Sequence, residues 1–181
     1  MNKISPLLSV GSILLDHDVV SRKRLFDEAS MVIEQSYGFA HTEVFEALFS
    51  REKLGCTCLG RGVALPHGSM PDIERVAFCF IRTKNPLTLD APDGRPVQLF
   101  LFLIVPETNK ESYICLLKEA AAILADKQIR AQLLEASTPA QVCEIIDSWV
   151  APQTESGEIK DDLEGEPTPE TEPADSIPPR V

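Results

Sequence analysis

One histidine and one arginine of this chain have the residue types and the spacing needed to handle a phosphoryl group. His67 stands in the run Gly-Val-Ala-Leu-Pro-His-Gly at positions 62–68, and Arg51 precedes it by sixteen residues. A neutral imidazole is a good nucleophile near neutral pH, because the pKa of free histidine is about 6.5. The guanidinium of arginine is permanently charged, and its planar fork matches phosphate oxygens. The pair is therefore a candidate site for accepting a phosphoryl group on His67.

The residues around His67 predict where its side chain lies. Positions 63–65 form a short apolar run typical of a buried strand. Pro66 cannot donate to a strand ladder and keeps the residue before it extended. Gly68 lets the backbone turn sharply or approach a ligand closely. We expect His67 at the end of a strand, where side chains of α/β proteins meet ligands, although a histidine after a proline is by itself more often a loop or packing residue.

A helix predicted for Thr42 to Leu54 brings Arg51 toward this strand. Its apolar residues at 45, 48 and 49 lie on one face, and Arg51 falls in its last turn or just beyond. The glycines at 55 and 60 allow the chain to turn back, so that Arg51 meets the histidine on the following strand.

The motif that contains both residues resembles a known family. Residues 51–55 and 59–68 are similar to the active-site motif of phosphotransferase-system IIA domains of the mannitol/fructose class, above all the nitrogen-regulatory IIA proteins. The similarity continues through residues 89–97, the apolar run 99–106 and residues 124–127. It covers nearly all of residues 5–150, and the motif is long and fixed in spacing.

The resemblance implies a function, a site and a fold. In that family the histidine matching His67 accepts a phosphoryl group from a phosphohistidine on an HPr-like carrier, and the arginine matching Arg51 steadies the charge. The two phosphorylation states bind different regulatory targets, such as sensor kinases and potassium transporters. The implied fold is a three-layer α/β/α arrangement with a central mixed sheet. The composition agrees with a cytoplasmic protein, and no cofactor is expected.

Two positions depart from the family pattern. The family usually carries a second active-site histidine at the start of the helix after the long strand, and the matching position here is Cys115. A thiol is a poorer partner for phosphate than an imidazole. The family's Ser-Thr-Gly reads Cys56-Thr57-Cys58 here. With these changes His67 is still expected to accept a phosphoryl group. The rate of acceptance and the onward transfer to a sugar-transport domain are left open.

Backbone amides and one hydroxyl are further candidates for holding the phosphate. Amides near Gly68 lie beside the histidine in sequence. The resemblance also places the start of a helix, near Thr108 to Ser112, next to it, and free amides at a helix N-terminus favour an added phosphate. Ser112 is therefore a candidate helper, with a surface serine in a first helical turn as the equal alternative. Thr108 followed by Glu111 fits a capping box.

The remaining pattern predicts helices on both faces of a mixed sheet. Hydrophobic periodicity predicts helices over residues 23–36 and 108–125, and a third from Thr138 to about Trp149 with proline at its first position. Residues 76–83 read as a strand. Val97 to Val105 is almost continuously apolar, as in a strand buried on both faces. This order independently predicts a three-layer α/β/α fold.

The charge divides the chain into a domain, residues 1–150, and a tail, residues 151–181. The chain has 181 residues and a net charge of −11. The tail holds nine acidic and two basic residues, a net charge of −7, together with six of the fourteen prolines. Such a composition does not offset the entropy of ordering, so we expect the tail to be disordered. Because both parts are acidic, nucleic acid is not an expected partner.

Membrane, disulfide and metal chemistry are not expected either. No apolar run is long enough to span a bilayer. Five cysteines at irregular spacing imply no disulfide framework, and reduced thiols are the simplest account. Cys56 and Cys58 have no second pair at zinc spacing, so a metal site is not predicted.

Two other functions remain open at this stage. One is a binding module that keeps the fold but is no longer phosphorylated, which Cys115 in place of the second histidine favours. The other is a sugar-specific IIA component of a fructose or mannitol permease. The absence of a sugar-transport domain from this sequence favours regulation over sugar transport.

Overall fold

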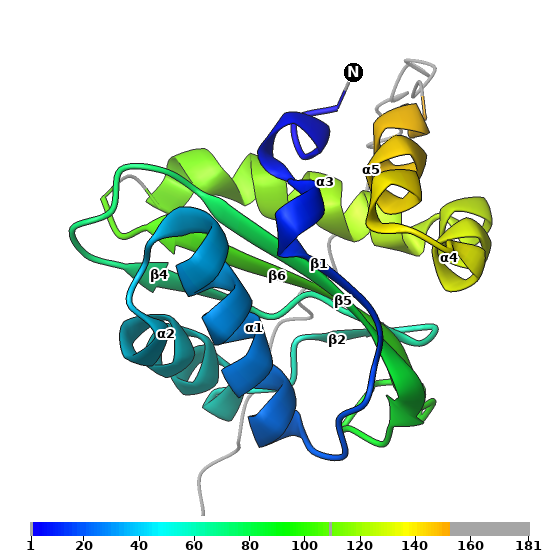
Figure 1. The fold of residues 1–181 in the computed structure, drawn as a ribbon, viewed down its shortest axis with the longest axis horizontal. Helices are drawn as coiled ribbons and strands as arrows, with labels where there is room; N and C mark the ends of the chain where they lie inside the picture. Colours follow the sequence, from blue (N-terminus) through cyan, green and yellow to red (C-terminus); the bar gives the residue numbers. More distant parts are fainter. Residues whose placement is uncertain (1, 109, 153–181) are drawn as a thin grey trace, which may run out of the picture. The chain divides into compact units, whose positions relative to one another are not determined.

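A six-stranded mixed sheet organises residues 2–108 and 110–152, the part of the chain that this computed structural model describes (Figure 1). The strand order is β1-β5-β6-β3-β2, and β4 also pairs with β6. The predicted tail lies, beyond position 152, outside the described residues. The strands are β1 (Ile13–His17), β2 (Cys58–Gly60), β3 (Val63–Ala64), β4 (His67–Met70), β5 (Ala77–Leu87) and β6 (Val97–Pro106).

Two short strands follow one another along the same side of β6. β3 pairs parallel to β6 with Val63 opposite Leu99, and β4 resumes the parallel pairing with His67 opposite Leu103. Pro66, which has no N–H to donate, lies in the interruption between them. The expectation that His67 ends a strand is therefore wrong, because it is the first residue of β4.

Alternation along β6 creates two cores. Phe100, Phe102 and Ile104 belong to the core on one face of the sheet, whereas Leu99, Leu101 and Leu103 belong to the core on the other. All ten residues of β6 are buried or half-buried. The prediction of a strand buried on both faces is confirmed.

Helices cover both of these faces, which confirms the three-layer α/β/α architecture (Figure 1). The helices α1 (Arg22–Tyr37) and α2 (His41–Lys53) supply side chains to the core around Phe100. The other core is closed by α3 (Ile114–Ala125), α4 (Lys127–Glu135) and α5 (Pro139–Ser148). Three short 3-10 helices complete the fold: η1 (Ser5–Leu7), η2 (Val10–Ser12) and η3 (Lys110–Tyr113). Within the described residues, no helix combines the length and the apolarity needed to cross a bilayer.

Side-chain caps begin three of the α-helices, α1, α4 and α5. The side chain of Thr138 accepts a hydrogen bond from the backbone N–H of Gln141, so α5 begins where the sequence predicts. The segment predicted as one helix over 108–125 instead starts as η3, and only then continues as α3. The N-cap of α3 is Tyr113, with no side-chain cap, so the predicted capping box does not start this helix. The helix α4, which the periodicity did not reveal, is capped by Asp126.

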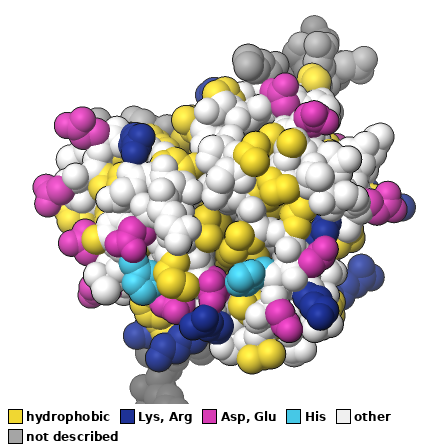
Figure 2. Space-filling model, in the orientation of Figure 1, with side chains coloured by type: hydrophobic (Ala, Val, Ile, Leu, Met, Phe, Trp, Pro, Cys, Tyr) yellow, Lys and Arg dark blue, Asp and Glu magenta, His cyan; other side chains and the backbone are white. Residues whose placement is uncertain are grey.

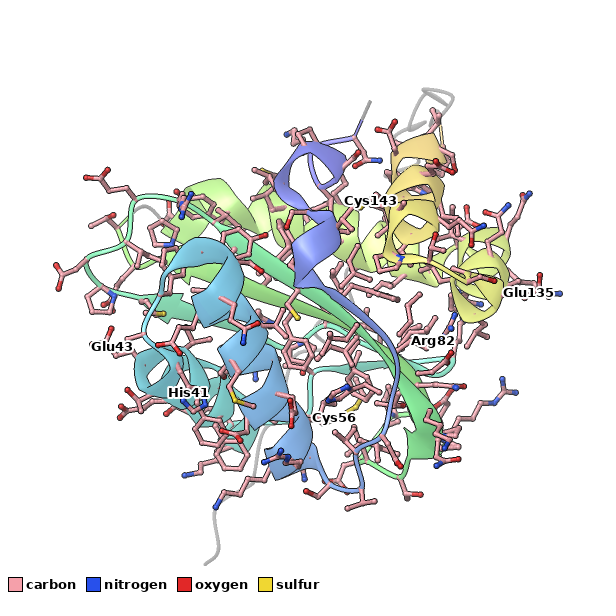
Figure 3. The ribbon with its side chains drawn as sticks, viewed as in Figure 1. His41, Glu43, Cys56, Arg82, Glu135 and Cys143 are labelled. Atoms are coloured by element: carbon pink, nitrogen blue, oxygen red, sulfur yellow. A yellow bond between two sulfur atoms is a disulfide. The ribbon has the colours of Figure 1, made fainter. Side chains whose placement is uncertain are left out.

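A buried arginine joins three segments on the α4 side of the sheet. Arg82, on β5, is 5% exposed. Its Nε and Nη2 each lie 3.0 Å from a carboxylate oxygen of Asp16. Its Nη1 donates to the carbonyl oxygens of Leu133, Leu134 and Ala136, at 2.9, 3.0 and 2.7 Å (Figure 3). The side chain therefore satisfies carbonyls at the C-terminal end of α4 that have no partner within the helix.

Candidate functional site

His67 and Arg51 line the same cavity. The cavity has a volume of about 530 Å³ and also receives Gly68, so three of the predicted site residues come together there. Arg51 reaches it from the last turn of α2, and His67 from the start of β4. The other lining residues are Ala47, Ser50, Leu54, Ser69, Val105, Glu111, Tyr113, Ile114 and Leu117.

Gly68 allows α2 and β4 to approach each other. A Cβ atom at this position would lie 2.7 Å from the carbonyl oxygen of Ala47, closer than real Cβ contacts come. Ala47 precedes Arg51 by one helical turn, so the close approach at Gly68 also determines how near Arg51 comes to His67. The glycine is needed for backbone proximity, a role distinct from the phosphate-holding amide that the sequence suggested.

Replacing Gly68 with alanine is expected to destabilise the domain by about 1–3 kcal/mol, because α2 must move away from β4. Phosphoryl acceptance by His67 should fall as well, because Arg51 moves with the helix. Urea denaturation measures the first effect. Gly11→Ala is the matched control, since its added Cβ would meet no atom closer than 3.9 Å. Equal stability of the two variants would contradict this role for Gly68.

The imidazole of His67 has a defined tautomer. Its Nδ1 lies 2.9 Å from the carbonyl oxygen of Leu65. A carbonyl oxygen can only accept a hydrogen bond, so we assign the proton to Nδ1 and the free lone pair to Nε2. Burial lowers the pKa of His67; the hydrogen bond to Leu65 opposes this, the positive charge of Arg51 adds to it, and the charge of Glu52 opposes it. The neutral, nucleophilic form is therefore favoured.

The lowered pKa of His67 predicts how the site responds to acid. Its NMR titration midpoint is expected below 6.5, the ordinary value, so the nucleophile stays neutral at lower pH than a free histidine would. Between the folded-state pKa and 6.5 the unfolded chain binds more protons than the folded chain. This group therefore makes the fold less stable as the pH falls through that window. A midpoint at or above 6.5 would contradict the assignment.

The guanidinium of Arg51 is available to an anion. Its Nη1 donates to the carbonyl oxygen of Gly55 at 3.1 Å. The other N–H groups of the guanidinium can then donate to an anion. Among the described residues, no carboxylate forms an ion pair with Arg51. A positive charge beside a neutral imidazole suits a phosphoryl group bonded to that imidazole.

The rim of the cavity is apolar. Leu54 is 83% exposed and Ile114 is 47% exposed, and both line the cavity with Tyr113 and Leu117. None of these residues was predicted from the sequence to belong to the site. Leu54 directly follows the last residue of α2, so it cannot belong to the buried face of that helix. An apolar residue at this position was the signal in the sequence. An exposed apolar rim around a reactive side chain is suited to contact with another protein.

The two remaining predicted site residues, Cys115 and Ser112, lie at and just before the start of α3. Cys115 is the second residue of α3 and is exposed, and among the described residues the cavity lining does not include it. Ser112 lies within η3, and its side chain is outside the described part of the structure. The start of α3 does reach the cavity, through Tyr113 and Ile114, as the resemblance implied.

Cys56 and Cys58 lie beside each other, with their Cα atoms 5.4 Å apart. Reduced thiols stay the expectation for this pair. The two residues are two positions apart in an extended segment, where their side chains point to the same side. Within the described residues, no group of three or more His, Cys, Asp or Glu side chains is arranged to hold a metal ion.

A buried carboxylate next to Arg51 was also not predicted from the sequence. Glu52 follows Arg51 but is only 6% exposed. The periodicity contained a signal for it, because the buried residues of α2 are Val44, Leu48 and Glu52, each four positions after the last. Its carboxylate accepts three hydrogen bonds, two from Thr57 and one from Arg22.

Comparison with known proteins agrees with the motif and the fold. A sequence model of the family described as "Phosphoenolpyruvate-dependent sugar phosphotransferase system, EIIA 2" matches residues 6–149. The nitrogen regulatory protein homolog of Haemophilus influenzae is 33% identical over 163 residues, which cover 88% of this chain and 99% of that protein. The nitrogen regulatory protein of Bradyrhizobium diazoefficiens is 36% identical over 138 residues, 76% of this chain and 90% of that protein.

Solved structures show the same arrangement. The crystal structure of the nitrogen regulatory protein IIA-Ntr from Neisseria meningitidis has 41% sequence identity and a TM-score of 0.76, and the match covers 80% of this chain and 99% of that one. The IIA mannitol protein of Escherichia coli, at 19% identity with a TM-score of 0.65 over 77% of this chain and 98% of that one, shares the fold. With its motif, its α/β/α fold and a family match over most of its length, the chain belongs to the type 2 EIIA family of the phosphoenolpyruvate-dependent sugar phosphotransferase system.

Proposed function

We propose that this protein is a nitrogen-regulatory-type phosphocarrier, which accepts a phosphoryl group on Nε2 of His67 from the phosphohistidine of an HPr-like carrier protein. One observation supports the assignment most directly. His67 opens into a cavity shared with Arg51 while its Nδ1 is engaged by Leu65, so that Nε2 holds the free lone pair. The names of the curated relatives add the regulatory assignment.

The transfer step requires only groups that this chain and the carrier supply. The Nε2 lone pair attacks phosphorus, the P–N bond to the carrier's imidazole breaks, and that nitrogen leaves with the electron pair. The proton on Nδ1 of His67 stays in place, donating to Leu65. Arg51 and the backbone amides near Gly68 stabilise the charge on the phosphoryl oxygens. Positioning and electrostatics supply most of the catalysis in such transfers.

Partner binding is expected at the apolar rim and at a larger groove beside it. That groove has a volume of about 1040 Å³ and shares Ala47, Ser50 and Ser69 with the His67 cavity. It is also lined by four carboxylates, Glu43, Glu46, Asp72 and Glu74. Phosphorylation adds a charge of about −2 between these surfaces, so the two forms would favour different partners. We propose that the protein acts in the cytoplasm and that its target classes are sensor kinases and potassium transporters.

A mass measurement tests the carrier function. The protein is incubated with phosphoenolpyruvate, enzyme I and an HPr-type carrier, then measured intact under alkaline conditions that preserve phosphohistidine. We expect a gain of one phosphate in the wild type and in His41→Ala, and none in His67→Ala. No gain with either nitrogen-type or sugar-type carriers would contradict the proposal. That result would favour the binding-module alternative, in which Cys115 marks a site that is no longer phosphorylated.

A further inference from the structure

Glu52 is a buried charge next to the proposed site. The residue is 6% exposed and belongs to the inward face of α2. Oε2 accepts hydrogen bonds from the backbone N–H of Thr57 at 3.2 Å and from the Thr57 hydroxyl at 2.6 Å. Because burying a carboxylate costs free energy unless it is paired and hydrogen-bonded, a role for this residue is expected.

A continuous path of hydrogen bonds runs from Glu52 to the imidazole of His67. Thr57, held by Glu52, accepts through its carbonyl oxygen from the backbone N–H of Leu65 at 3.0 Å. The carbonyl oxygen of the same Leu65 lies 2.9 Å from Nδ1 of His67. The position of the Leu65 carbonyl, which selects the tautomer of His67, thus depends on the loop that Glu52 holds.

Arg22 fixes the other end of this path. Its Nη1 lies 3.4 Å from Oε1 of Glu52, and its Nη2 lies 3.8 Å from a carboxylate oxygen of Asp90. Arg22 is the first residue of α1, at the end of the helix where Figure 2 shows basic side chains gathered. Two helices and the loop that follows α2 are therefore tied together at one carboxylate.

The charges around His67 also include Glu52. Arg51 and Glu52 are adjacent in sequence, but Arg51 lines the cavity whereas Glu52 faces the protein interior. Their charges act on His67 in opposite directions, since the positive charge of Arg51 lowers its pKa and the negative charge of Glu52 raises it. Glu111 is the further charged group that lines the cavity.

We infer that Glu52 is a positioning residue for phosphoryl transfer: through Thr57 and the Leu65 peptide it holds the His67 imidazole with Nδ1 protonated and Nε2 facing the donor. The inference rests on the proposed function for its consequence. The orientation of His67 is an independent property of the unphosphorylated protein, and it is measurable without any carrier.

Glu52→Met tests the inference, because methionine keeps the length of the side chain and removes both acceptor oxygens. We expect the single-turnover rate of acceptance at saturating carrier to fall roughly tenfold, since small misplacements of reacting groups have effects of that size or larger. The carrier concentration at half-saturation should not change. Nitrogen NMR of the imidazole should show the Nε2-protonated tautomer gaining population.

Further substitutions distinguish the positioning role of Glu52 from the effect of its charge and from a loss of folding. Glu52→Gln retains a carbonyl oxygen for Thr57, so it should recover most of the rate while the pKa of His67 falls with the lost negative charge. Thr57→Val removes the hydroxyl donor and should act like Glu52→Met in a milder form, whereas Thr57→Ser should behave like the wild type. Glu135→Gln, at an exposed position of α4 on the other side of the sheet (Figure 3), is the charge-matched control.

The outcomes are distinct. Wild-type rate and wild-type tautomer in Glu52→Met, with that variant folded by thermal denaturation, would overturn the positioning role. So would an equal loss of rate in Glu135→Gln. If Glu52→Met fails to fold, Thr57→Val provides the same comparison. A tautomer shift in a protein that never accepts phosphate would contradict the proposed function and support the orientation of His67 by Glu52.

Discussion

Replacing Arg82 with methionine is expected to lower the free energy of unfolding by about 3–5 kcal/mol, because it leaves buried acceptors without a donor. The guanidinium donates hydrogen bonds to the carbonyl oxygens of Leu133, Leu134 and Ala136, and it pairs with Asp16. Because Arg82 is only 5% exposed, water has little access to replace these lost hydrogen bonds. For a chain of this size the midpoint of thermal unfolding should fall by roughly 10 °C. Calorimetry or urea denaturation measures the change.

Two control substitutions divide this effect between the ion pair and the carbonyls. Asp16 has a side chain that is 66% exposed, so Asp16→Asn should cost about 1 kcal/mol or less. Arg82→Lys keeps the charge but not the planar fork, and it should fall between the two. If Asp16→Asn destabilised the protein as much as Arg82→Met, the ion pair and not the end of α4 would be the main contribution.

Replacing Arg51 with alanine is expected to slow phosphoryl acceptance by His67 about 100- to 1000-fold, the usual effect of removing one donor to a developing negative charge. The change should have little effect on folding, because the only hydrogen bond that the Arg51 side chain makes among the described residues is to the carbonyl oxygen of Gly55. Single-turnover transfer from a phosphorylated carrier, followed by intact mass, measures the rate. Arg51→Lys should retain part of it, because the charge remains but bidentate contact with phosphate does not.

The matched control for Arg51 lies in the same turn of α2. Lys53 is also basic and is exposed, and its ammonium lies 5.2 Å from the ring centroid of Phe49. Lys53→Ala removes the same charge from the same helix end, but not from the cavity. Comparable slowing in Lys53→Ala and Arg51→Ala would mean that general positive charge, and not contact with the phosphoryl group, is responsible.

Local sequence was a good guide to the elements that bury a regular apolar face. The periodicity of α1 and α2, the continuous apolar run of β6 and the Thr138 cap of α5 each depend on residues within one segment. The strands β1, β2 and β4 were not found, because short strands exist only through pairing with a partner elsewhere in the chain.

The residue types in the motif were sufficient to select His67 and Arg51 as the candidate pair, because nucleophilicity and phosphate binding are properties of single side chains. Contacts between distant segments decided the rest. The close approach of Gly68 to Ala47 sets the separation of α2 and β4, and the path from Glu52 through Leu65 selects the tautomer of His67. Most of these contacts involve backbone N–H and C=O groups, which nearly every residue carries, so the sequence does not show which of them will meet. The tertiary structure decides it.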